Sequence, residues 1–145
     1  MKKSHENPYA VYRMTHDLLH VVYKKGISID LKAAQHIVRD RMLLQEGKVI
    51  PVLCDIRGVK KVNKPARDYF ALEGSLWVKA LAFLIDPPIS DMISDFYLGT
   101  HAPSFPTRSF TNKSEALAFL KTVMALVMVF SLGQLDIIPQ IGRLC

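Results

Sequence analysis

Cysteine and glycine are scarce in this chain, which has two cysteines and seven singly scattered glycines. Cys54 lies inside an apolar run and Cys145 ends the chain, so the sequence has neither a disulfide framework nor a cysteine-rich metal site. A reducing cytoplasm is therefore the expected compartment. Isolated glycines exclude a glycine-rich phosphate-binding loop, and no serine or cysteine lies in a nucleophile-elbow motif. We expect no cofactor, no resident metal and no enzymatic activity.

Long apolar runs are also missing. Residues 122–135 form an uncharged stretch of 14 residues, shorter than the roughly 20 that span a bilayer. We therefore expect no membrane span, and we interpret the stretch as a buried helix or an oligomer contact. Residues 123–130 would be apolar on every face of a helix, and an interfacial membrane helix would need a cationic face as well. Met124, Val127 and Met128 are the candidates for self-association as a homodimer.

The composition that is present is typical of one globular domain. The chain has 145 residues, of which 50% are hydrophobic and 22% charged, with a net charge of +6. Its first residues carry no apolar segment of the secretion-signal type. We expect residues 1–8 to be a disordered lead-in, residues 9–122 to form the domain, and residues 123–145 to form an apolar C-terminal helix and tail.

The hydrophobic pattern predicts an α/β fold with a mixed sheet. An N-terminal antiparallel hairpin is followed by alternating helices and buried strands, and such alternation is typical of layered domains. The helix after the hairpin is expected to begin at Asp30 and to end before Gly47. In order, the expected elements are strands within 9–14 and 18–26, a helix at 31–46, a strand at 49–55, a loop at 56–64, a helix from 65, a strand at 78–86, a helix at 87–100, a strand at 107–111 and a helix at 112–133.

Two aspartates end the buried strands. Asp55 and Asp86 would both lie at the carboxyl edge of the sheet, where ligands of open α/β sheets gather. Two neighbouring carboxylates can hold Mg²⁺ or shift each other's pKa. Aspartates also end strands simply because the chain reaches water there, and we favour this second interpretation for Asp55.

A basic segment follows Asp55. It has no acidic residue and includes Arg57, Lys60, Lys61, Lys64 and Arg67. A phosphate-bearing ligand, an acidic protein face or an anionic membrane surface would suit this charge, and a solvated loop is the alternative. Nucleic acid is not expected, because the segment is short and has no aromatic residue for stacking.

The order of elements resembles the small stand-alone bacterial STAS-like proteins, relatives of the anti-sigma-factor antagonists and of the STAS domains of sulfate transporters. The resemblance covers residues 9–121 and is carried by Asp55, the helix start at Ala66-Arg67 and the segment FPTRSFTNKSEALAFL. It implies a cytoplasmic module that binds proteins or small ligands without catalysis. In the antagonists a serine at the start of the helix after the central strand is phosphorylated, and this chain has no serine or threonine between Asp55 and Arg67.

Three hypotheses follow. The first is a protein-interaction or regulatory module that binds an acidic protein surface through Asp55 and the basic residues at 57–67. The second is a carrier of a small anionic or amphiphilic ligand, because the family is similar in shape to CRAL-TRIO lipid-binding domains. The third is a metal-assisted enzyme that uses Asp55 and Asp86.

Overall fold

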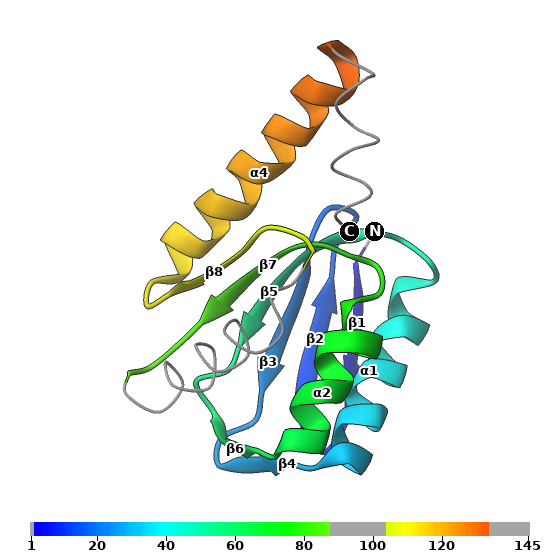
Figure 1. Ribbon diagram of the computed structural model, residues 1–145, viewed down its shortest axis with the longest axis vertical. Helices are drawn as coiled ribbons and strands as arrows, with labels where there is room; N and C mark the ends of the chain where they lie inside the picture. The colour runs from blue at the N-terminus through cyan, green and yellow to red at the C-terminus, as the bar shows by residue number, and fades with distance from the viewer. Residues whose placement is uncertain (1, 88–103, 134–145) are drawn as a thin grey trace.

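The computed structural model describes residues 2–87 and 104–133. Its centre is a six-stranded mixed sheet in the order β1-β2-β3-β5-β7-β8 (Figure 1). The first three strands pair antiparallel, and β3, β5, β7 and β8 are parallel neighbours. The predicted mixed α/β sheet is confirmed. The strands are β1 Lys3–Glu6, β2 Ala10–Met14, β3 Leu19–Tyr23, β5 Ile50–Asp55, β7 Val78–Leu84 and β8 Thr107–Phe110.

The N-terminal residues form an edge strand. β1 pairs with β2 along its length, with Lys3 opposite Met14 and Glu6 opposite Val11. The prediction of a disordered lead-in over residues 1–8 is therefore wrong at residues 3–6. The sequence KSHE has no apolar alternation that would indicate a strand. It is stabilised by pairing with β2 and by contacts to the first helix, such as the Lys3 to Glu46 ion pair at 3.2 Å.

Two helices cover one face of the sheet. α1 (Leu31–Gln45) begins where the Asp30 side chain accepts a hydrogen bond from the N–H of Ala33 at 2.8 Å, and Gly47 follows its end with φ +84°. α2 (Lys64–Leu72) has Pro65 in its first turn, and the single-turn helix η1 (Glu73–Ser75) follows it. The predicted positions of both helices are confirmed.

The segment predicted as a loop at 56–64 contains a strand. β6 (Val59–Val62) pairs in parallel with β4 (Ile27–Ile29) in a second, two-stranded sheet. The loop prediction is wrong there, because the pairing joins segments about thirty residues apart that no local pattern connects. A Cβ atom at Gly58 would lie 2.5 Å from the carbonyl oxygen of Lys24, so this approach requires glycine.

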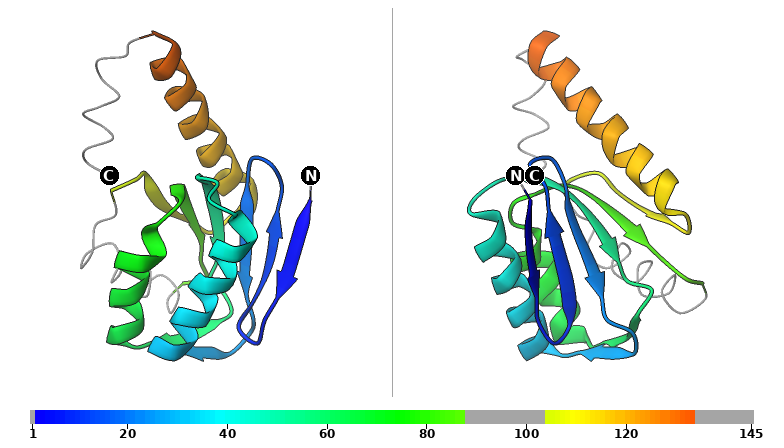
Figure 2. Two further views of the ribbon diagram at one scale, coloured as in Figure 1. Left: turned by 90° about the vertical axis from the view of Figure 1, so that its right-hand side faces the viewer. Right: turned by 180° about the vertical axis from the view of Figure 1, so that it is seen from behind.

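The opposite face of the sheet is covered by α4 (Lys113–Gly133), as Figure 2 shows from two sides. Its N-terminus is capped by Asn112, whose side chain accepts from the N–H of Glu115 at 3.1 Å. Ala116 and Leu120 pack on Leu53, Ala80 and Ala82 in a small core, and the larger core lies between the sheet and the α1–α2 layer. The second half of α4 projects beyond the sheet (Figure 1).

The C-terminal part of the chain is described only in part. The helix predicted at 87–100 lies outside the described residues, apart from Pro87. The predicted boundary between 122 and 123 falls inside the single helix α4, and the division into a domain at 9–122 and a C-terminal segment at 123–145 stays a prediction. None of the described helices is both long and apolar enough to cross a membrane.

Candidate functional site

Asp55 ends β5 at the carboxyl edge of the sheet and is buried. The Arg57 side chain donates two hydrogen bonds to it, from Nε to Oδ1 at 2.9 Å and from Nη2 to Oδ2 at 2.7 Å. Burial alone would raise the pKa of Asp55, but the hydrogen bonds and charge of Arg57 outweigh burial and hold this pKa below its usual value. Asp55 is therefore an ionised, fully engaged carboxylate.

Asp86 follows β7 on the same edge and is exposed. The pKa of Arg57 is raised, first by its hydrogen bond to Asp55 and less by the charges of Asp55 and Asp86. The Arg57 guanidinium is thus paired with Asp55, at the place where the third hypothesis would put a cation. Within residues 2–87 and 104–133, no group of three His, Cys, Asp or Glu side chains could hold a metal ion.

His20 of β3 also faces this region and was not a candidate residue. Its ring is half-buried, and its Nε2 atom has no hydrogen-bond partner. Burial lowers the pKa of His20, the charge of Lys113 lowers it further, and the charge of Asp55 opposes both effects. We therefore describe His20 as a neutral ring at pH 7, beside Asp55 rather than bonded to it.

The predicted basic residues take different environments. Arg57 is paired with Asp55, Lys64 with Asp68 at 2.8 Å, and half-buried Arg67 donates to the carbonyl of Val62 at 2.6 Å. Of these five predicted residues, Lys60 and Lys61, both on β6, are the two that are exposed and have no ion pair among the described residues.

A further lysine joins them. Lys25 is exposed in the turn between β3 and β4, and this turn is held by a hydrogen bond from the N–H of Gly26 to the carbonyl of Gly58 at 2.6 Å. No pattern in the sequence pointed to Lys25, because it is far from the basic segment along the chain. We call the surface formed by Lys25, Lys60, Lys61 and Lys64 the basic edge.

An apolar cavity of about 110 Å³ lies between the sheet and the α1–α2 layer. α2 packs mainly on α1 rather than on the strands, and this leaves space between α2 and the sheet. Two cationic side chains, Arg41 and Arg67, belong to its lining. Burial raises the pKa of the Cys54 thiol in this lining to about 12, so the thiol stays protonated at neutral pH. The apolar lining includes Val52, Cys54, Leu81 and Phe83 of the sheet and Phe70 of α2.

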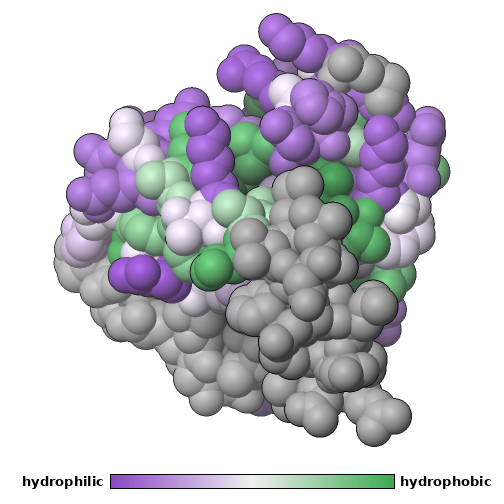
Figure 3. Space-filling model, turned by 90° about the horizontal axis from the view of Figure 1, so that it is seen from above, coloured by the Kyte–Doolittle hydropathy of each residue, from purple (hydrophilic) through white to green (hydrophobic). Residues whose placement is uncertain are grey.

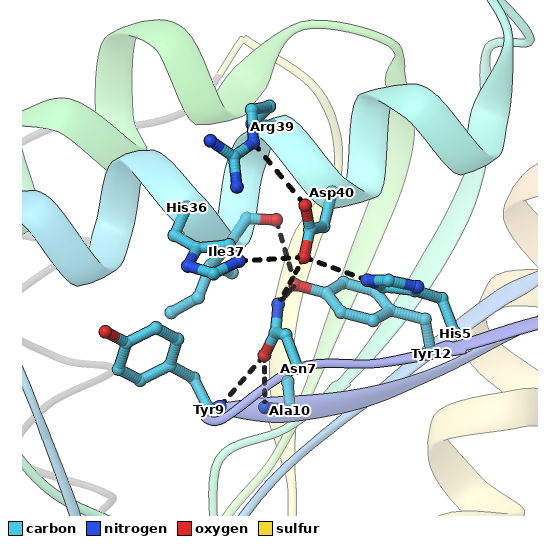
Figure 4. A network of polar contacts seen from close by, with 9 residues as sticks. All are labelled: His5, Asn7, Tyr9, Ala10, Tyr12, His36, Ile37, Arg39 and Asp40. Atoms are coloured by element: carbon cyan, nitrogen blue, oxygen red, sulfur yellow. Dashed lines mark hydrogen bonds and ion pairs between the residues drawn. The ribbon is translucent and has the colours of Figure 1, made fainter.

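A polar cluster around Asp40 fastens the N-terminal strands to α1 (Figure 4). Asp40 is 8% exposed, and its Oδ2 atom lies 2.9 Å from His5 Nε2, 2.9 Å from Asn7 Nδ2 and 3.2 Å from His36 Nε2. The Tyr12 hydroxyl donates to the carbonyl of Ile37 at 2.9 Å. No pattern in the sequence predicted this cluster, for which the spacing of four between His36 and Asp40 is the only local signal.

The residues predicted for self-association lie in α4. Met124 is half-buried and Leu126 is 52% exposed, whereas Val127 and Met128 lie outside the residues whose side chains are described. Figure 3 views the molecule from the end at which α4 projects, and hydrophobic residues reach the surface there among hydrophilic ones. Self-association stays a prediction.

Comparison with known proteins places the chain by sequence and by fold. The model of the family "Domain of unknown function (DUF7793)" matches residues 12–124. The chain belongs to this family. None of the curated proteins compared with the sequence matches it.

The structure is similar to a crystal structure of an uncharacterized protein of the DUF3478 family, with a SpoIIAA-like fold, from Shewanella loihica PV-4. The TM-score is 0.52 at 12% identity, and the match covers 83% of this chain and 92% of that chain. At this identity the likeness shows the fold alone. The expected STAS-like fold is confirmed, and the family found is DUF7793 rather than a family of anti-sigma-factor antagonists.

Proposed function

We propose that this DUF7793 chain is a non-enzymatic, STAS-like interaction module, whose basic edge binds an acidic protein surface. The observation that best supports this proposal is the exposure of Lys60 and Lys61 on β6. Both residues lie on the two-stranded sheet of β4 and β6, with Lys25 two residues before β4 and Lys64 two residues after β6 in the chain. A cytoplasmic setting, which suits the reduced thiol of Cys54, is part of the proposal.

The charge balance favours docking over catalysis. Arg57 donates two side-chain hydrogen bonds and one backbone hydrogen bond to Asp55, and this pairing favours a structural role for Asp55 over that of a base or a metal ligand. Exposed lysines attract an acidic surface at long range, and this attraction weakens as salt shortens the Debye length from about 10 Å at 0.1 M. We therefore expect binding that is fast and strongly dependent on ionic strength.

A poly-glutamate peptide tests the basic edge. We expect it to shift the amide signals of β4 and β6 in NMR spectra at low salt, and we expect the Lys60→Glu/Lys61→Glu variant to lose this binding. The matched control is Lys2→Glu/Lys48→Glu, which changes net charge equally at two other exposed positions. Equal weakening by both double variants would show that only net charge matters and would contradict the proposal.

The apolar cavity supports a second candidate function, the carriage of a small amphiphilic anion. An engineered apolar cavity of about 150 Å³ binds benzene, so a space of about 110 Å³ suits a small ring or a short alkyl segment. Arg41 and Arg67 would face the acidic group. Arg41 is itself buried, where it donates to Gln45 and to the carbonyl of Gly74.

Native mass spectrometry tests the carrier function. Freshly purified protein should carry an extra mass that is lost on denaturation, and the cavity-filling variant Val52→Phe should lack it. Leu43→Phe is the control, because Leu43 is exposed and outside the cavity lining. Repeated preparations without extra mass would contradict the carrier function, and a lower Tm of Val52→Phe would show that the core is too closely packed there to admit a ligand.

A further inference from the structure

A second hollow lies on the outer surface of α1, away from both the basic edge and the apolar cavity. It has a volume of about 470 Å³, within the 300–1,000 Å³ typical of small-molecule sites. Four of its residues, spaced by three or four, form one face of α1, and tyrosines approach this face from the β1–β2 turn and from α2. We call it the tyrosine groove, lined by Tyr9, Lys32, Gln35, His36, Arg39 and Tyr69.

The lining of the groove is cationic and aromatic. Lys32 and Arg39 carry its charge, and no carboxylate belongs to the lining. Lys32 has no ion pair among the described residues, and Arg39 touches Asp40 only through Nε, at 3.5 Å. The two terminal nitrogens of Arg39, whose side chain is 64% exposed, can therefore form the paired hydrogen bonds that a carboxylate accepts.

The walls of the groove are held in place from behind. The Asn7 side chain accepts hydrogen bonds from the N–H groups of Tyr9 and Ala10, each at 2.9 Å, which fixes the turn that carries Tyr9. Asp40 holds His36, whose ring meets the Tyr9 ring edge-on at 5.6 Å. Figure 4 shows Tyr9, His36 and Arg39 on one side of Asp40. A preorganised site loses less entropy when a ligand binds.

We propose that the tyrosine groove binds an aromatic carboxylate, with the planar ring against Tyr9 and Tyr69 and the carboxylate on Arg39 and Lys32. Both tyrosines are half-buried, and no hydrogen bond to either phenol oxygen occurs within the described part of the chain. Their rings thus offer apolar faces with a polar tip, which suits a flat ligand. The ligand is either a free aromatic acid or the C-terminal aromatic residue of a peptide.

Matched probes separate the contribution of the ligand's carboxylate from that of its aromatic ring. In calorimetric titrations of the full chain we expect 2-naphthoate to bind at least about tenfold more tightly than the neutral isostere 2-naphthamide, and acetate not to bind measurably; tenfold corresponds to one good charge-assisted interaction. The peptide Gly-Gly-Phe with a free carboxylate, compared with its amide, distinguishes the peptide source from the free acid. Equal binding of naphthoate and naphthamide, or no binding by either carboxylate probe, would overturn the proposal.

Variants locate the binding. Arg39→Gln should reduce the preference for naphthoate over naphthamide, since Lys32 remains, whereas Tyr69→Leu should weaken both ligands by about fivefold or more. Lys60→Gln in the basic edge and Val52→Phe in the cavity are controls that should leave naphthoate affinity unchanged. Unchanged affinity in Arg39→Gln and Tyr69→Leu, with loss in a control, would place the ligand elsewhere. Because the groove shares no residue with the basic edge or the cavity, failure here leaves the proposed function untouched.

Discussion

Asp40 shows how a single buried carboxylate joins distant parts of this chain. It lies on α1, and its Oδ2 atom forms hydrogen bonds with the side chains of His5 on β1 and Asn7 in the following turn. Burial would raise the pKa of Asp40, but the hydrogen bonds from Asn7 and His5 and the charge of His36 outweigh burial and hold this pKa below its usual value. The ionised carboxylate therefore stabilises the folded state.

We expect Asp40→Asn to lower the free energy of unfolding at pH 7 by about 1–3 kcal/mol, because it weakens buried hydrogen bonds to a charge. The folded pKa is the depressed one, so the contribution is fully present above the unfolded pKa of about 3.9 and is lost as pH falls through the folded value. Urea unfolding at pH 7 and below pH 4 should show the gap between wild type and variant closing in acid.

Asp68→Asn is the matched control for this residue. Its partner Lys64 is exposed, and such surface pairs contribute about 0–1 kcal/mol. If Asp40→Asn were no more destabilising than Asp68→Asn at pH 7, the cluster around Asp40 would be a surface feature without a stabilising role.

At the scale of elements, the pairing of β4 with β6 places the basic edge. Both strands are short, and they are brought together where the chain passes Gly58 close to the Lys24 carbonyl. Val59 is buried in the main core while Lys60 and Lys61 stay exposed, so one short strand both anchors the segment and presents its charge.

Gly58→Ala should separate these strands. The added Cβ would meet backbone atoms of Lys24 at 2.5 and 2.8 Å, so we expect a loss of roughly 2 kcal/mol or more in the free energy of unfolding. Gly74→Ala is the control, because its Cβ would meet the Phe70 side chain at 3.3 Å, which can shift. Hydrogen exchange should become faster in β4 and β6 of Gly58→Ala, and wild-type protection there would contradict this account.

At the scale of the whole molecule, net charge and one projecting helix have opposite effects on self-association. Two chains of +6 repel each other, whereas the second half of α4, which projects beyond the sheet in Figure 1, belongs to an uncharged stretch of the sequence. An apolar helix face that projects from a domain favours burial against another surface. The predicted self-association through Met124, Val127 and Met128 is consistent with this placement.

Leu126→Glu should reduce any dimer population by about tenfold or more, because burying an unpaired charge in an apolar contact is costly. Sedimentation velocity over a range of protein concentrations measures this. Leu43→Glu is the control, since Leu43 is 70% exposed on α1 and Leu126 is 52% exposed on α4. A wild-type chain that stays monomeric at the highest concentration would contradict self-association.

The sequence by itself determined the order of the larger elements, which are the N-terminal hairpin of β2 and β3, the helices α1, α2 and α4, and the strands β5, β7 and β8. These elements follow from local patterns, because each depends on residues that are close together in the chain. Examples are the helical spacing between Asp30 and Gly47, the apolar runs at 50–55 and 78–84, and the turn before β3. What only the tertiary structure decided was which distant groups meet. The strand at 3–6, the β4–β6 pair, the Asp40 cluster and the tyrosine groove all depend on contacts across tens of residues, which leave no periodic signal in the chain. Asp55 and Arg57 are only two residues apart in the chain. The hydrogen bond between their side chains nevertheless depends on the tertiary structure, because Asp55 lies at the buried end of β5.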